Sequence, residues 1–143
     1  MIHGLDTSFL VATELASHGQ HAASHGLLQR LSHAGDNFAL APQVLAEFVH
    51  VVADPRRCST PLTVPAALER AELLWNAAQV VQVLPDQAAE SQFLSWMRQH
   101  RLGRKRLLDT LLAATYWSAG IRSLVTLNRG DFDVFGCFTA AEP

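Results

Sequence analysis

Four carboxylates fall at or near the ends of expected strands or at the starts of expected helices, and three of them interrupt apolar sequence. Asp6 follows an apolar N-terminal run, and Glu47 and Asp109 each interrupt apolar sequence. Asp131 lies in a polar loop that follows another short apolar run. Burying an isolated carboxylate in apolar surroundings is expensive, and several that converge repel one another unless a cation lies between them. Hard oxygen ligands select Mg²⁺ or Mn²⁺, so these residues suggest a divalent-metal site.

The elements that must position these acids alternate along the chain. We expect strands at 1–5, 38–41, 80–84 and 123–126, with an edge strand around 137–138. We expect helices at 8–18 (capped by Thr7 or Ser8), 21–32, 42–52, 66–78, 87–101 and 107–117. Alternating strands and helices predict an α/β fold with a mostly parallel central sheet flanked by helices. Functional groups in such sheets gather beyond the carboxyl ends of the strands, where these acids fall.

The composition bounds the class of protein. A chain of 143 residues with 49% hydrophobic and 17% charged residues predicts one globular domain over 1–143 and excludes disorder. No apolar run reaches the roughly 18 residues of a membrane span, and the N-terminus lacks the features of a signal peptide. Cys58 and Cys137 are widely separated, and their spacing neither requires nor excludes a disulfide. We therefore expect a cytoplasmic protein.

Four segments in order carry a family resemblance across nearly the whole chain. They are Leu5-Asp6-Thr7-Ser8-Phe9-Leu10-Val11, Val44-Leu45-Ala46-Glu47-Phe48, Leu108-Asp109-Thr110-Leu111-Leu112-Ala113-Ala114-Thr115 and Leu124-Val125-Thr126-Leu127-Asn128-Arg129-Gly130-Asp131-Phe132. The sequence resembles the PIN-domain family, and within it the VapC-type toxins of bacterial toxin–antitoxin pairs. The resemblance implies a PIN-like three-layer sandwich, a Mg²⁺-dependent endoribonuclease activity in which Mn²⁺ can substitute, and a cognate antitoxin as partner.

The resemblance also implies roles for individual residues. The catalytic quartet is Asp6, Glu47, Asp109 and Asp131, with Asp6 and Asp109 as metal ligands. Either Asp131 or Asn128 completes the metal site, because family members differ in where that loop places its carboxylate. Glu47 could orient or deprotonate the attacking water. Ser8, Thr126 and Asn128 are candidates for hydrogen bonds to substrate or to the ligands themselves.

Five basic residues fall within nine positions, although the net charge of the chain is −2. They are Arg98, Arg101, Arg104, Lys105 and Arg106. The run is compatible with a solvated helix end, where cations suit the helix dipole, and equally with an RNA-phosphate rim formed by its last four members. Three tryptophans on Leu-rich helices suggest more apolar surface than one small core needs, so we expect a homodimer.

Other interpretations of these residues are weaker. His18, His21 and His25 have helical spacing, but closed zinc sites use four ligands and no cysteine lies near. Asp6 after a strand also suits a phosphatase of the haloacid-dehalogenase type, yet the second acid of that chemistry is replaced by Ser8. Asp109 by itself suits a helix start. The remaining alternative to a nuclease is a non-catalytic PIN-like module that binds RNA or protein.

Overall fold

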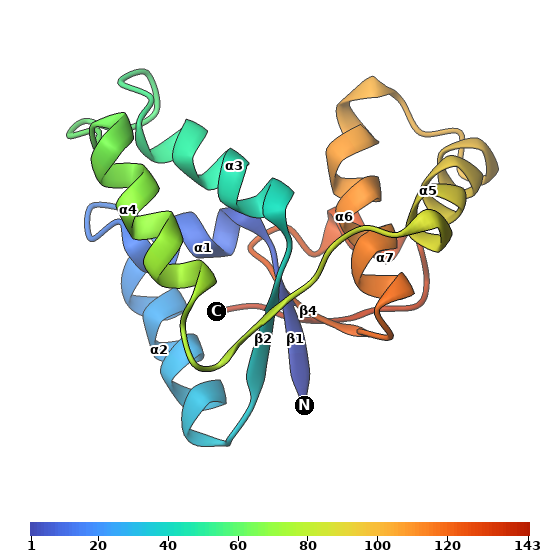
Figure 1. The fold of residues 1–143 in the computed structure, drawn as a ribbon, viewed down its shortest axis with the longest axis horizontal. Helices are drawn as coiled ribbons and strands as arrows, with labels where there is room; N and C mark the ends of the chain where they lie inside the picture. The colour runs from blue at the N-terminus through green and yellow to red at the C-terminus, as the bar shows by residue number, and fades with distance from the viewer.

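A five-stranded parallel sheet forms the centre of the protein in the computed structural model, which describes residues 1–143 (Figure 1). The strands are β1 (Ile2–Leu5), β2 (Asn37–Leu40), β3 (Val80–Gln82), β4 (Ser123–Val125) and β5 (Thr139–Ala141). Their order across the sheet is β3-β2-β1-β4-β5, and every neighbouring pair is parallel. The predicted fold class is confirmed, and the sheet is entirely parallel.

The helices fall into two groups around this sheet. They are α1 (Thr7–Glu14), α2 (His21–His33), α3 (Pro42–Val52), α4 (Val64–Trp75), α5 (Gln87–Gln99), α6 (Leu107–Ser118) and α7 (Gly130–Asp133), with the 3₁₀ turn η1 (Arg104–Arg106) before α6. Figure 1 shows α1 to α4 on the left and α5 to α7 on the right of the strands. The chain builds β1, β2 and β3 outward in one direction and then returns to place β4 on the other side of β1. The point between β1 and β4 is therefore the topological switch point.

Several local expectations need correction. Asp6, rather than Thr7 or Ser8, is the N-cap of α1, and α1 ends at Glu14, four residues earlier than expected. The helix α5 ends at Gln99 instead of Arg101, which adopts a left-handed backbone with φ 51°. The expected polar loop after β4 is partly helical, because Gly130 and Asp131 begin the short helix α7. The edge strand lies at Thr139–Ala141, two residues beyond its expected place.

Aromatic residues from several helices lie in the core. Phe9, Phe48 and Tyr116 are almost fully buried, and Trp96 stacks on Phe135 with ring centroids 4.5 Å apart. Trp75 and Trp117 are only partly buried and pack against this core. No helix is both long and apolar enough to cross a membrane. Neither cysteine forms a disulfide.

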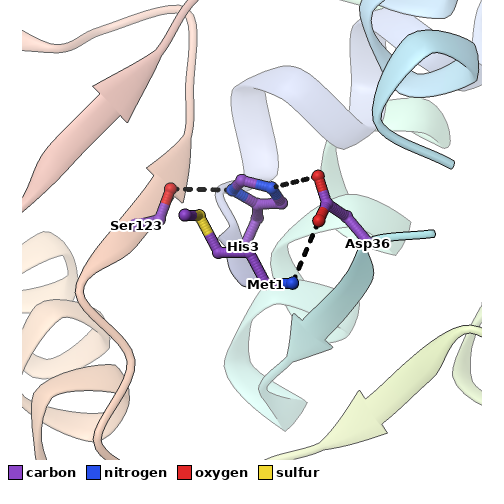
Figure 2. Close-up of polar contacts among 4 residues, drawn as sticks. All are labelled: Met1, His3, Asp36 and Ser123. Carbon is purple, nitrogen blue, oxygen red and sulfur yellow. Dashed lines mark hydrogen bonds and ion pairs between the residues drawn. The ribbon is translucent and has the colours of Figure 1, made fainter. Parts of the chain in front are cut away.

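A polar cluster ties together the amino-terminal edge of the sheet (Figure 2). His3 on β1 lies with Nδ1 2.7 Å from Oγ of Ser123 on β4, and with Nε2 3.1 Å from Oδ2 of Asp36. The N-terminal ammonium of Met1 pairs with the other oxygen of Asp36 at 3.0 Å. His3 is 5% exposed, so its ring bridges β4 and the turn before β2 from a nearly buried position. The candidate catalytic acids lie at the opposite, carboxyl-terminal edge.

Candidate active site

A cleft of about 460 Å³ opens beyond the carboxyl ends of β1 and β4. All four acids of the expected quartet line it, namely Asp6, Glu47, Asp109 and Asp131. Ser8 and Asn128 line the same cleft, and Thr126 lies buried beneath it. In parallel α/β sheets a ligand binds at this edge, at the topological switch point. The fold therefore brings together side chains that are up to 125 positions apart (131 − 6) in the sequence.

Asp6 stands at the base of the cleft as the N-cap of α1. Its Oδ1 accepts a hydrogen bond from the backbone N–H of Thr7 at 2.8 Å. Its Oδ2 accepts from the hydroxyls of Ser8 at 3.0 Å and Thr126 at 2.7 Å. Burial raises the pKa of Asp6, these hydrogen bonds oppose the rise, and the charge of Glu47 adds to it. Asp6 is thus a strongly oriented carboxylate in surroundings that disfavour its charge.

Glu47 reaches the cleft from α3, which begins at Pro42 directly after β2. The hydroxyl of Thr7 donates to Oε2 of Glu47 at 3.0 Å. Glu47 is exposed, whereas Asp6 is buried. Adjacent residues of α1 therefore bind two different acids, because Ser8 contacts Asp6 and Thr7 contacts Glu47.

Asp109 lies in the first turn of α6 and is partly buried. Burial is the main cause that raises its pKa to about 6, and the charges of Asp6 and Asp131 raise it further. The guanidinium of Arg106 lowers this pKa, and Glu47 makes a smaller contribution in the raising direction. The raised pKa of Asp109 thus includes repulsion from the other acids of the cleft.

Asp131 lies on α7, and its backbone is tied to the loop that follows β4. Its N–H donates to the carbonyl of Asn128 at 3.0 Å, and its own carbonyl accepts a hydrogen bond from the guanidinium of Arg106. The N–H of Asn128 donates to the hydroxyl of Thr126 at 2.9 Å. This loop is therefore held from both sides, by Thr126 at the end of β4 and by Arg106 before α6.

The acids fit a hard divalent cation by their chemistry. No three acidic, histidine or cysteine side chains are close enough to form a ready-made ligand set. Mg²⁺ does not need one, since it keeps several waters and binds through one or two carboxylates together with substrate phosphate. Asp6 and Asp109 both have raised pKa values, and the carboxylates around Asp109 raise its pKa further. A divalent cation would relieve the repulsion among the carboxylates of the cleft.

The basic run lies beside the cleft without lining it. Arg101, Arg104 and Lys105 are exposed on the segment that joins α5 to α6. Arg106 is partly buried, and its guanidinium binds the carbonyl of Asp131. Arg98 lies in the last turn of α5. Arg106 thus already has a place in the site as a support for the Asp131 loop.

Three residues of the site were not expected from the sequence. Thr7 orients Glu47, and His18 and Arg57 line the cleft. The sequence places His18 at the end of an expected helix, directly before Gly19, and Arg57 in a Pro-containing loop. Both positions are typical of solvated residues. Nothing in the sequence near Arg57 distinguishes it from Arg56. Their place in the cleft follows from how the loops after α1 and α3 meet, which is a tertiary property.

Comparison with known proteins identifies the family. The PIN domain profile matches residues 5–135. No curated protein matches this sequence. Among solved structures, Mycobacterium tuberculosis VapC20, a sarcin-ricin loop cleaving toxin, is similar with a TM-score of 0.74 and 23% identity over 100% of both chains.

Two toxin–antitoxin complexes are also similar in fold. VapBC-1 from nontypeable Haemophilus influenzae has a TM-score of 0.70 and 16% identity over 99% of this chain and 98% of that one. VapBC2 from Rickettsia felis, solved with a DNA fragment from its promoter, has a TM-score of 0.71 and 16% identity over 100% and 99%. With the profile match spanning most of the sequence, the chain belongs to the PIN domain family.

Proposed function

We propose that the protein is a Mg²⁺-dependent endoribonuclease that acts as the toxin of a toxin–antitoxin pair. The observation that carries the proposal is the convergence of Asp6, Glu47, Asp109 and Asp131 in one cleft at the switch point of the sheet. The raised pKa of Asp109, to about 6, supports it, since repelling carboxylates are what a divalent cation would neutralise. Membership of the PIN family and the fold shared with VapC20 point to the same activity.

Asp6 and Asp109 are the residues that would hold the metal. When bound, a divalent ion lowers the pKa of a coordinated water and neutralises charge that develops on the phosphodiester. Ser8 and Thr126 hold Oδ2 of Asp6 in place. Glu47, fixed by Thr7, can orient the attacking water and accept its proton. Asp131 and Asn128 border the cleft from the loop after β4, where either oxygen can complete the site.

We also propose a protein antitoxin as partner and a homodimer as the assembled form. The VapBC complexes of similar fold support a partner of the antitoxin kind. Exposed apolar side chains on the helices support pairing of two copies: Val64, Leu68, Leu73, Leu94, Leu107 and Leu108. Light scattering at micromolar concentration tests the dimer, and a monomer at that concentration contradicts it.

We also propose that the protein is located in the cytoplasm, which an RNA substrate and two cysteines without a disulfide support.

The decisive experiment measures RNA cleavage with and without metal. Wild-type protein should degrade cellular RNA in Mg²⁺ and lose this activity in EDTA. Asp109→Asn should abolish cleavage and weaken Mn²⁺ binding, because it removes a ligand charge. Asp133→Asn is the matched control, since Asp133 lies on α7 beside Asp131, pairs with Arg129 and does not line the cleft. Wild-type cleavage by Asp109→Asn in Mg²⁺ would show that the proposed metal site is wrong.

Expression in cells gives an independent test of the toxin assignment. The wild-type protein alone should arrest growth, and Asp109→Asn should not. Harmless expression of an intact wild-type protein contradicts the toxin assignment. RNA binding without cleavage by the metal-loaded wild type would instead favour a non-catalytic PIN-like module.

A further inference from the structure

Two side chains that carry hydrogen-bond donors line the cleft and have no part in the proposed metal chemistry. His18 comes from the segment between α1 and α2, and Arg57 from the loop between α3 and α4. Figure 1 shows these helices on the side of the sheet away from α6. Asp109 and the basic run approach the cleft from the α6 side. His18 and Arg57 therefore form a wall that faces the one built by α6.

This wall bears the only arginine, lysine or histidine side chains that line the cleft. A polyanion that enters a cleft with four carboxylates meets repulsion, which one divalent cation offsets only in part. Phosphate contacts from cationic and N–H donors are what position a nucleic-acid backbone. Arg104 and Lys105 lie outside the lining, so they cannot act at the bottom of the cleft. His18 and Arg57 are placed to do so.

Arg57 lies near an acidic residue of its own loop. Oδ1 of Asp54 accepts the backbone N–H of Arg56 at 2.9 Å, which shapes the turn after α3. The other oxygen of Asp54 lies 3.8 Å from Nε of Arg57. This is an ion pair without a hydrogen bond, so the terminal guanidinium nitrogens of Arg57 stay available for a second acceptor. A guanidinium can bind phosphate through two parallel N–H groups. Arg56 contacts the same carboxylate but is 93% exposed and does not line the cleft.

His18 is oriented by the turn that follows it. Its Nδ1 accepts a hydrogen bond from the backbone N–H of Gln20 at 3.0 Å. A ring nitrogen that accepts a hydrogen bond carries no proton, so the proton of the neutral imidazole lies on Nε2. Nε2 has no partner within the protein, which makes it an N–H donor whether the ring is neutral or charged. His18 is partly buried, and a donor held in this way needs little reorganisation to bind an anion.

We propose that Arg57 and His18 bind the phosphates of an RNA strand on either side of the scissile bond, Arg57 through its terminal guanidinium nitrogens and His18 through Nε2. The inference rests on the proposed ribonuclease function and identifies how that site holds its substrate. Both residues are substrate-binding groups, distinct from the metal ligands. The scissile phosphate then lies between this wall and the acids.

The test compares neighbouring residues that share a loop but differ in whether they line the cleft. The probe is a fluorescein-labelled single-stranded RNA oligonucleotide of mixed sequence, and binding is followed by anisotropy in the Asp109→Asn background, in EDTA, at several salt concentrations. Arg57→Ala should weaken binding by about three- to tenfold. It should also make the plot of log K against log[salt] shallower by about 0.7, which is the contribution of one neutralised phosphate in a single strand. Arg56→Ala should leave this slope unchanged. His18→Ala should weaken binding, and His18→Gln should restore most of it because an amide N–H replaces Nε2–H.

The same variants in otherwise wild-type protein separate this inference from the proposed function. With Mg²⁺, Arg57→Ala and His18→Ala should raise KM for RNA and leave Mn²⁺ affinity unchanged. His33→Gln, on the exposed end of α2, is the control for histidine replacement. If wild type cleaves RNA and Arg57→Ala matches Arg56→Ala in KM and salt slope, Arg57 does not bind the substrate. Equal KM for His18→Ala and wild type overturns the role of His18. A wild type that does not cleave RNA at all contradicts the proposed function instead.

Discussion

The hydroxyl of Thr126 lies 2.7 Å from Oδ2 of Asp6 and donates a hydrogen bond to it. Thr126 is the residue after β4 and Asp6 the residue after β1, so this contact joins the two strand ends at the switch point. Both side chains are buried. The same hydroxyl accepts the N–H of Asn128, so one oxygen fixes both the carboxylate and the start of the loop that carries Asp131.

Replacing Thr126 tests this contact. Thr126→Val keeps the shape of the side chain and removes the hydroxyl. The N–H of Asn128 then loses its acceptor, and Asp6 loses one of the three hydrogen bonds that orient it. Because hydrogen-bond partners of metal ligands contribute about 10- to 100-fold to affinity or activity, cleavage should fall within that range. Thr126→Ser should retain most activity. RNA cleavage and Mn²⁺ titration measure both, and equal activity of Thr126→Val and wild type contradicts the role.

Asp109→Asn should stabilise the metal-free protein at neutral pH. The pKa of Asp109 is raised from 3.8 to about 6 in the folded state, so folding favours the protonated carboxyl. The stability that this group contributes is present below about pH 4 and is lost as pH rises through about 6. Above pH 7 the ionised carboxylate therefore carries a cost that asparagine lacks, on the order of 1–3 kcal/mol. Thermal unfolding in EDTA at pH 7.5 should show a higher Tm for Asp109→Asn.

Two further conditions check the cause of that difference. Near pH 4 the two proteins should melt at nearly the same temperature, because the folded wild type is then protonated at Asp109. Addition of Mg²⁺ at pH 7.5 should raise the Tm of wild type more than that of the variant, since only a folded protein with both ligands binds the ion well. If Asp109→Asn has a lower Tm than wild type in EDTA at pH 7.5, ionised Asp109 does not destabilise the folded protein.

Much of the fold is readable from local pattern. Short apolar runs bounded by Pro42, Pro85 and Gly120 predict the strands and helices to within a few residues. The first helix is shorter than its pattern suggests, because the C-cap at Leu15 adopts an extended backbone. The helix α7 is missed because it is one turn long, and a single turn has no periodicity to detect.

Local pattern alone indicates a site residue only where a side chain breaks an apolar run, whereas Asp131, Asn128 and Ser8 are indicated by the family resemblance. Asp6 and Asp109 stand out because a carboxylate in apolar sequence demands an explanation. Thr7 does not stand out, because a threonine at a helix start suits a cap equally well. Arg57 differs from Arg56 only in which direction the loop after α3 directs it. That direction depends on Asp54 and on the neighbouring loops, and no local pattern encodes it.

Gly4→Ala should destabilise the protein and impair the site above it. A Cβ at position 4 would lie 2.6 Å from Cδ2 of Tyr116 and 2.9 Å from Cδ2 of Leu124, closer than carbon atoms approach. Tyr116 is fully buried and its hydroxyl donates to the carbonyl of Leu5 at 2.6 Å, so it cannot move without disturbing the strand end before Asp6. Overpacking of this kind costs about 1–3 kcal/mol. Gly19→Ala, where no atom lies within 4 Å, is the control in urea unfolding.

The cluster in Figure 2 should make stability fall in acid. The hydrogen bond from His3 is the largest cause that holds the pKa of Asp36 below its ordinary value of 3.8, and the ammonium of Met1 acts in the same direction. The stability contributed by ionised Asp36 is therefore present at neutral pH and is lost as pH falls through its lowered pKa. Asp36→Asn should lower the Tm at pH 7 and flatten the loss of stability below pH 4. Asp133→Asn, which removes only an exposed ion pair with Arg129, should change the loss of stability below pH 4 little.

Substitutions within the basic run should have two different effects, depending on whether the residue is exposed or contacts the Asp131 loop. Arg104 and Lys105 are exposed, so Ala at both should reduce the salt slope of RNA binding by about 0.7 for each phosphate that is no longer neutralised and leave Mn²⁺ affinity intact. Arg106→Ala should act differently, because its guanidinium binds the carbonyl of Asp131 and lowers the pKa of Asp109. Without it the Asp131 loop loses a support and the pKa of Asp109 rises further, so metal binding at pH 6 to 7 should weaken along with cleavage. Mn²⁺ titration and RNA anisotropy on the two variants separate these effects.

An unchanged salt slope for Arg104→Ala/Lys105→Ala would show that the exposed part of the run is a solvated helix end. An unchanged Mn²⁺ affinity for Arg106→Ala would show that Arg106 does not support the metal site.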